Sequence, residues 1–187
     1  MEYEKIEKVY EGAYLDYYNV TYRNEDGQEK VYEMVSRDKQ IDSKEKLYDH
    51  STDAVVMIVN DVSDEHVVLV KEFRLELGKT IFGFPAGLID PGETAAECAV
   101  RELKEETGLD VSDFAGGYVF SYTRENPDEG DNYFVDIYCF TGDFSESDLH
   151  LQKAETDGYM LVTADEIKEL GVQGKFLHYD SIKQVFA

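Results

Sequence analysis

The sequence predicts an α/β protein of the α+β type, in which a mixed β-sheet is sandwiched between helices and a small antiparallel sheet precedes it. Three observations support this class. Short segments with alternating apolar and polar residues fill residues 1–50, two nearly continuous apolar runs follow at residues 52–59 and 66–73, and a helical segment spans residues 94–107. Strands on both sides of one central helix are typical of a sheet covered by helices. With 187 residues, the chain is long enough for one sizeable core and a small additional unit.

The N-terminal segment is expected to form an antiparallel meander of strands. Alternation is visible at Val9-Tyr10, at residues 14–22 and at residues 31–35. Asp26-Gly27 separates the last two stretches, and this dipeptide is a common hairpin turn. We therefore expect two domains, a β-meander at residues 1–50 and a main domain at residues 51–187.

The main domain is expected to begin with a buried hairpin, because residues 60–65 between its two apolar runs form turns readily. The central helix follows, with its apolar residues on one stripe and Gly108 placed to end it. Two further strands are expected at residues 118–120 and 133–140, joined by a polar loop at residues 123–132. A third strand at residues 159–162 and helices at residues 165–170 and 181–186 complete the domain.

The charge of the chain excludes several classes of partner. It holds 41 acidic and 18 basic residues, which gives a formal net charge of −23. Such a chain repels a nucleic-acid polymer and an anionic membrane surface. The longest aliphatic run has six residues, residues 54–59, whereas a membrane helix needs about twenty. The N-terminus lacks the features of a secretory signal, and Cys98 and Cys139 read as small buried hydrophobes, so we expect a cytoplasmic protein.

Three carboxylates share one face of the predicted central helix. At 100° per residue, Glu102, Glu105 and Glu106 fall within an arc of about 100°. Like charges at this spacing destabilise a helix unless a cation lies among them. Magnesium prefers oxygen ligands and is commonly held by carboxylates together with substrate phosphates. The helix therefore predicts a divalent metal site that faces a cleft.

The spacing of residues around this cluster resembles the Nudix box at every defined position. The order is Gly87, five residues, Glu93, seven residues, Arg101-Glu102-Leu103, one residue, Glu105-Glu106, one residue, then Gly108-Leu109. The resemblance implies a Nudix fold and hydrolysis of a nucleoside diphosphate linked to another moiety, with magnesium or manganese as cofactor.

The resemblance also implies a ligand set for that metal. Glu102 and Glu106 would be the principal side-chain ligands, Glu105 a third, and the Ala86 carbonyl a fourth. The glycine at position 87 lets the backbone pass close to the site. We expect Arg101 and Glu93 to form a structural ion pair that holds the loop on the helix.

Beyond the box, most of the chain resembles the ADP-ribose pyrophosphatase branch of this family. The matching segments are VYEG, YEMVSR, VLVKEFR and FPAGLID, which begin at residues 9, 32, 68 and 84. The resemblance implies a homodimer built with the N-terminal sheet. It also assigns Tyr32 to stacking on an adenine, Arg37 to a nearby substrate contact and Arg74 to the diphosphate.

Three positions depart from that branch and put strict ADP-ribose specificity in doubt. Gly83 stands where an acidic residue is common, Leu75 where proline is frequent, and Pro127 lies further from the box than the proline expected there. The catalytic centre is unaffected by these departures.

The general base is open between two glutamates. Glu155 best matches the position of the family's catalytic glutamate, and Glu129 matches a residue at the ribose side of the substrate and is the second candidate. The four histidines lack the spacing of metal ligands. The expected reaction is hydrolysis of ADP-ribose to AMP and ribose 5-phosphate; another nucleotide sugar or a dinucleotide, or a non-catalytic ligand sensor, are the alternatives.

Overall fold

The computed structural model describes residues 1–49, 51–62, 65–126, 131–152, 156–176 and 179–186. Contacts divide the chain into two compact units, Met1–Ser51 and Thr52–Ala187.

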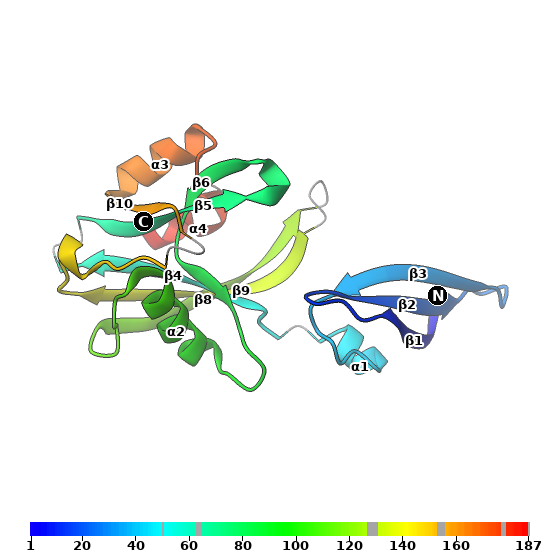
Figure 1. Cartoon of the computed structure of the whole chain (residues 1–187). Coiled ribbons are helices and arrows are strands. Elements are labelled where there is room, and N and C mark those ends of the chain that lie inside the picture. The colour runs from blue at the N-terminus through cyan, green and yellow to red at the C-terminus, as the bar shows by residue number, and fades with distance from the viewer. Residues whose placement is uncertain (50, 63–64, 127–130, 153–155, 177–178, 187) are drawn as a thin grey trace. The chain divides into compact units, whose positions relative to one another are not determined.

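The N-terminal unit is an antiparallel sheet with strand order β1-β2-β3 (Figure 1). Its strands and the short helix that follows are β1 (Glu2–Tyr10), β2 (Asp16–Arg23), β3 (Glu29–Ser36) and α1 (Lys44–Leu47). The β2–β3 turn contains Gly27, whose φ of 76° suits the predicted turn. Ser43 begins α1, because its side chain accepts a hydrogen bond from the Lys46 amide. The expected meander is present.

The core of the N-terminal unit is small. Among its described residues, the buried apolar side chains are Tyr18, Val20 and Ile41. Several large apolar side chains stay exposed on the same unit: Val9, Tyr10, Tyr14, Leu15, Tyr17, Val31 and Val35. Exposed apolar side chains that gather on one unit are typical of an interaction surface.

The second unit is built on a mixed sheet with strand order β10-β5-β4-β9-β8, to which β6 and β7 add by pairing with β5 and β4. The β4–β9 pair is parallel and the others are antiparallel. The strands are β4 (Ala54–Asp61), β5 (Val67–Arg74), β6 (Lys79–Gly83), β7 (Ala86–Leu88), β8 (Ala115–Asn126), β9 (Asp131–Gly142) and β10 (Gly158–Val162).

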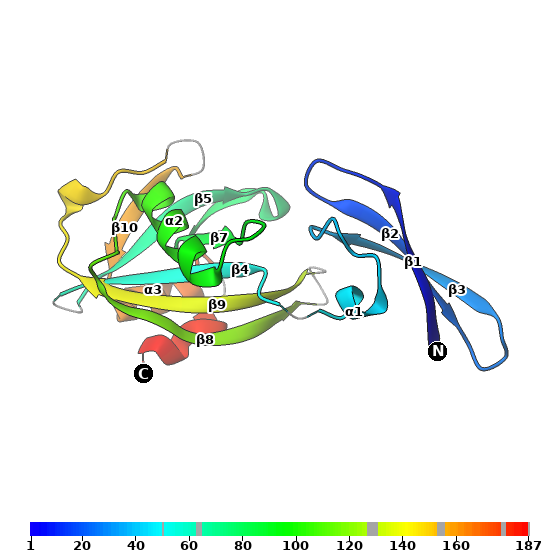
Figure 2. The same ribbon diagram turned by 90° about the horizontal axis from the view of Figure 1, so that it is seen from below.

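Helices cover both faces of this sheet (Figure 2). They are α2 (Ala95–Thr107), α3 (Ala164–Val172) and α4 (Tyr179–Ile182), with 3₁₀ turns η1 (Leu75–Leu77), η2 (Glu146–Asp148) and η3 (Lys183–Phe186). The residues of α2 pack with Val55 and Met57 in one apolar cluster, whereas α3 and α4 pack with Ile58 in another. Because neighbouring residues of a strand point to opposite faces, β4 supplies both clusters. The predicted sheet between helices is confirmed, and no described helix is long and apolar enough to cross a membrane.

Three elements differ from the sequence-based expectation. Strands β8 and β9 continue through most of the predicted loop 123–132, and their backbones pair as far as Asn126 and Asp131. The residues that pair here are mostly polar, so the sequence carries no apolar alternation that predicts the strands. Among the described residues, the expected hairpin of β4 and β5 is short: Asn60 pairs with Val67, and the Asp61 amide donates to the His66 carbonyl. The other ends of β4 and β5 pair with β7 and β6. The last predicted helix is a short α-turn followed by a 3₁₀ turn.

Candidate active site

The acidic helix α2 is capped at both ends. Thr94 accepts a hydrogen bond from the Glu97 amide, and the Glu97 carboxylate accepts one from the Thr94 amide, which forms a capping box. Gly108 ends the helix with a left-handed φ of 82°. The predicted helix and its glycine stop are confirmed. This fixed register determines which glutamates face strand β7.

Gly87 lies in direct contact with the side chain of Glu102. A Cβ atom at position 87 would lie 2.0 Å from Glu102 Cδ and 2.3 Å from its Oε1, far inside ordinary van der Waals distance. The absence of a side chain at this position therefore lets the carboxylate of α2 lie against the backbone of β7. The Gly87 backbone itself is ordinary extended strand, paired with Val55 of β4.

Glu106 reaches the same strand from one turn further along α2. The Ala86 amide donates a hydrogen bond to Glu106 Oε2 over 3.3 Å, and only 9% of Glu106 is exposed. Ala86 in turn pairs with Val56 of β4. Ala86, Glu102 and Glu106 are thus brought together by β7 and α2. The Glu105 side chain is about half exposed and lies at the edge of this group.

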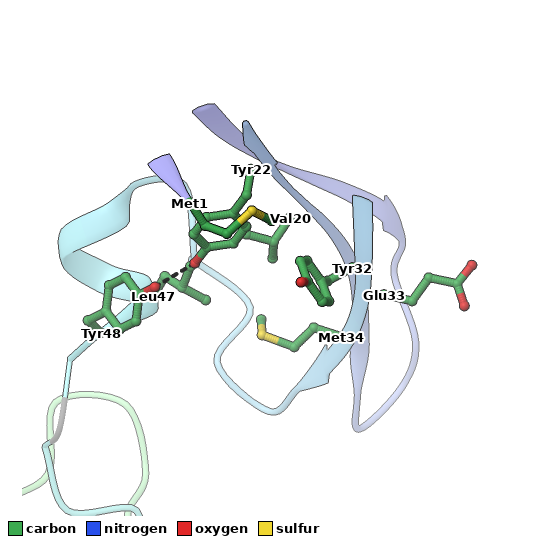
Figure 3. A pocket seen from close by; sticks show the side chains of 8 residues that line it. All are labelled: Met1, Val20, Tyr22, Tyr32, Glu33, Met34, Leu47 and Tyr48. Carbon is green, nitrogen blue, oxygen red and sulfur yellow. Dashed lines mark hydrogen bonds between the residues drawn. The ribbon is translucent and has the colours of Figure 1, made fainter. Parts of the chain in front are cut away.

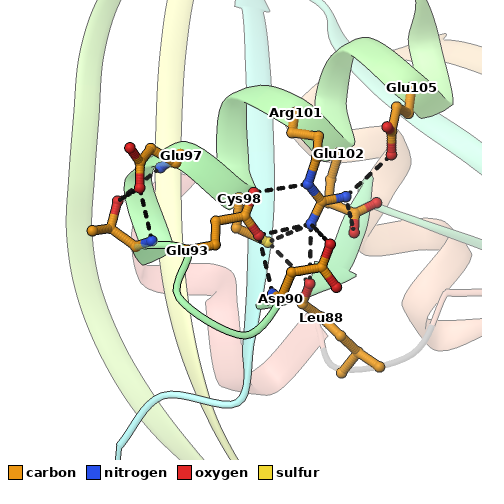
Figure 4. Close-up of polar contacts among 9 residues, drawn as sticks. Leu88, Asp90, Glu93, Glu97, Cys98, Arg101, Glu102 and Glu105 are labelled. Atoms are coloured by element: carbon orange, nitrogen blue, oxygen red, sulfur yellow. Dashed lines mark hydrogen bonds and ion pairs between the residues drawn. The ribbon is translucent and has the colours of Figure 1, made fainter.

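Arg101 connects the carboxylates of the helix and its loop (Figure 4). Its Nε and Nη2 donate to the two oxygens of Glu93, each over 2.8 Å, which confirms the expected ion pair. Its Nη1 lies 2.8 Å from Glu102 Oε1 and 3.1 Å from Glu105 Oε2, and Nη2 also donates to the Leu88 carbonyl. The hydrogen bonds from Arg101 lower the pKa of Glu93 to about 2. Glu93 therefore remains ionised and holds the arginine in place.

The donor set suits a hard divalent cation. Carboxylate oxygens and a backbone carbonyl are the ligands that magnesium and manganese prefer. Within the described ranges, no three His, Cys, Asp or Glu side chains already converge as a ready-made ligand cluster. Arg101 forms ion pairs with Glu102 and Glu105. The missing side chain at Gly87 lets Glu102 lie against the strand. The residues present therefore fit a magnesium or manganese ion whose remaining ligands come from water and substrate.

Next to this group is a small cavity of about 100 Å³ in the second unit. Ala86 is common to both, since it lines the cavity and also contacts Glu106. The other lining residues are Val56, Glu72, Arg74, Ile81, Phe82, Gly83, Phe84, Tyr122, Phe176 and Ile182. Arg74 Nε is buried and has no hydrogen-bond partner among the described residues, which costs about 1–3 kcal/mol unless a ligand provides an acceptor.

A larger cavity of about 470 Å³ lies in the N-terminal unit (Figure 3). Tyr32 lines it, whereas Arg37 is exposed after β3. The other lining residues are Met1, Val20, Tyr22, Glu33, Met34, Leu47 and Tyr48. The hydroxyls of Tyr22 and Tyr48 are 2.5 Å apart, and this contact, followed by burial, raises the pKa of Tyr22 to about 12. Tyr22 and Met34 belong to no motif of the sequence, although strand alternation places both on the Tyr32 side of the sheet.

The structure describes only some of the sequence-based candidates and histidines. Glu129 and Glu155, together with His50 and His178, fall outside the described residues. Of the remaining histidines, His66 lies 3.6 Å from Asp61, and His150 donates its backbone amide to the Thr107 carbonyl. The positions of the candidate bases thus rest on the sequence alone.

Comparisons with known proteins agree with this architecture. A sequence model of the NUDIX domain matches residues 50–181. The chain is 39% identical to putative nudix hydrolase 2 of Caenorhabditis elegans over 104 residues, which are 54% of this chain and 44% of that protein. It is also 34% identical to the ADP-sugar pyrophosphatase of the mouse (Mus musculus) over 102 residues, which are 54% of this chain and 45% of that protein. The matched stretches thus cover less than half of either relative. A crystal structure of an ADP compounds hydrolase aligns over 100% of this chain and 91% of its own, with a TM-score of 0.63 and 20% identity, and shares the fold.

Proposed function

The chain belongs to the NUDIX family, and we propose that it is a metal-dependent pyrophosphohydrolase that splits ADP-ribose, or a related ADP-sugar, into AMP and a sugar phosphate. The observation that carries the proposal is the meeting of Glu102 and Glu106 with Ala86 and Gly87. The similarity to an ADP-sugar pyrophosphatase supports the substrate class.

Ala86, Glu102 and Glu106, with Glu105 at the edge, would hold magnesium or manganese. When bound, such an ion neutralises the diphosphate and lowers the pKa of a coordinated water. Arg101 pairs with Glu102 and Glu105 and holds their side chains in place before the ion arrives. The protein's own contribution is therefore a fixed set of anionic ligands on one helix.

Other residues orient the substrate and move the proton. Arg74 binds the diphosphate from the small cavity, where its Nε requires an acceptor. Tyr32 stacks on the adenine and Arg37 contacts the same part of the substrate. Water attacks one phosphorus, the bond from that phosphorus to the bridging oxygen breaks, and Glu155 accepts the proton of the water. Glu129 contacts the ribose and is the alternative base.

We expect the active form to be a homodimer. The exposed apolar residues of the N-terminal sheet, such as Tyr10, Tyr17 and Val35, give a second copy a surface to cover. Light scattering after size exclusion measures the mass directly. A mass near 21.4 kDa, that of one chain, would contradict the dimer. The two cysteines carry free thiols, which suits a reducing compartment such as the cytoplasm.

The activity is tested by measuring AMP release from a panel of substrates with magnesium, with manganese and with a chelator. The panel contains ADP-ribose, other nucleotide sugars and adenine dinucleotides. ADP-ribose or an ADP-sugar is expected to give the highest kcat/KM. A preference for a dinucleotide would show a different substrate specificity, which is compatible with the departure from the ADP-ribose branch at Gly83. No turnover of any member would show a ligand sensor instead of an enzyme.

A further inference from the structure

Glu72 and Arg74 form an ion pair inside the small cavity of the second unit. They are two residues apart on β5, so their side chains leave the same face of the strand. Arg74 Nη2 lies 2.6 Å from Glu72 Oε1. Both side chains line the cavity that also contains Ala86. The pair therefore shares a cavity with Ala86, whose amide donates to Glu106 of the acidic helix.

Gly83 gives the carboxylate of this pair its space. Strands β5 and β6 are antiparallel, with Val70 opposite Gly83 and Glu72 opposite Ile81. A Cβ atom at position 83 would lie 3.6 Å from Glu72 Oε1, at ordinary contact distance. The Glu72 carboxylate thus extends diagonally across the ladder and lies over the bare backbone of Gly83. A carboxylate carried by position 83 would start from the same region of the cavity.

The pair leaves most of the guanidinium available. A guanidinium carries five N–H donors in a fixed planar fork, and the pair occupies Nη2. Nε is buried without a partner among the residues that the structure describes. A carboxylate that holds one end of a guanidinium fixes the direction of the other donors. The orientation of Arg74 is therefore set before an anion binds.

We infer that Glu72 is a positioning residue that orients Arg74 toward the diphosphate of the substrate. The inference rests on the proposed function and adds a residue to it. Glu72 carries a negative charge close to an anion, so removing it has two opposing effects: it frees Arg74 to rotate and it lowers repulsion. The positioning role requires that the first effect dominates.

A double-mutant cycle separates these effects. The variants are Glu72→Gln, Arg74→Ala and the combination of both, assayed on the nucleotide sugar that the wild type turns over best. We expect Arg74→Ala to raise KM by about tenfold or more and Glu72→Gln by about fivefold, with kcat within about twofold of the wild type. The double variant is expected to have a KM equal to or below that of Arg74→Ala, because without the arginine the removal of Glu72 can only lower repulsion of the anion.

A rescue experiment tests the geometry. Adding Gly83→Glu to Glu72→Gln returns a carboxylate to the cavity from strand β6, and KM is expected to fall back to within about twofold of the wild type. A matched control is Glu4→Gln, which removes another 2.6 Å Glu–Arg pair, with Arg23 in the N-terminal unit, and is expected to leave KM unchanged. Thermal unfolding of each variant shows whether it is folded.

Two results overturn the positioning role in an active enzyme. One is a Glu72→Gln variant whose KM is unchanged or lower. The other is a double variant whose KM increase is the product of the two single increases. If the wild type turns over no nucleotide sugar, the proposed function fails first and the role of Glu72 falls with it. Turnover by the wild type therefore distinguishes a failure of the proposed function from a failure of the positioning role.

Discussion

Replacing Gly87 with alanine should disable the site while leaving the fold intact. The added Cβ would lie 2.0 Å from Glu102 Cδ and 2.2 Å from its Cγ, whereas carbon atoms in contact are normally about 3.5–4.0 Å apart. Glu102 must therefore move by more than about 1 Å, and a displacement of that size can cost about 10²-fold in rate. Overpacking costs on the order of 1–3 kcal/mol, which a folded domain usually survives. We expect kcat to fall about 10²-fold, equivalent to about 2.7 kcal/mol.

The assay is AMP release from ADP-ribose at saturating magnesium, combined with the midpoint of thermal unfolding. Gly92→Ala is the matched control, because position 92 lies in the loop that joins β7 to α2, has a φ of 88° and has nothing within 4 Å of an added Cβ. This control should lose about 1 kcal/mol of stability through backbone strain and keep its kcat. A Gly87→Ala variant with kcat within about threefold of the wild type would refute the contact between Gly87 and Glu102 as the feature that orders the site.

Three further predictions concern acidic residues. Glu106→Gln keeps an acceptor for the Ala86 amide but loses the charge, so turnover should fall by about 10³-fold or more with an unchanged melting temperature. Retained activity would show that the metal ligands are wrongly assigned. Because the pKa of Glu93 is lowered in the folded state, its pair with Arg101 stabilises the protein above about pH 4.5 and this stability is lost as the pH falls toward 2; chemical denaturation should show a shallower loss in Glu93→Gln, and parallel curves would contradict this. Glu155→Gln should lower kcat by more than about tenfold and Glu129→Gln by less, and the reverse order would make Glu129 the base.

The central helix and its ion pair could be predicted because their signals are local. Thr94 with Glu97 starts the helix, Gly108 ends it, and a 3.6-residue period then fixes which glutamates share a face. The contact between Gly87 and Glu102 also follows from a short segment of chain, since a glycine at a fixed spacing from the helix points to a close approach.

Features that depend on neighbouring strands could not be predicted in the same way. The partner of Arg74 is set by the conformation of β5 beside β6, and the sequence gives no sign that Glu72 lies over Gly83. The contact between Tyr22 and Tyr48 joins a strand to the segment after α1, which no periodicity connects. The length of the β8–β9 ribbon could not be predicted because its end is held by backbone pairing between mostly polar residues, which have no apolar pattern.

The parallel pairing of β4 with β9 also has a consequence for the order of folding. Ala54 pairs with Val135, so the whole of α2 and the loop before it lie within the stretch of chain that this pair closes. Pairing between distant segments slows folding, because chain entropy is lost before the contacts form. Helix α2 has local caps and can form early, whereas β7 reaches its place only beside β4. The site should therefore assemble late, in the same slow step that completes the sheet.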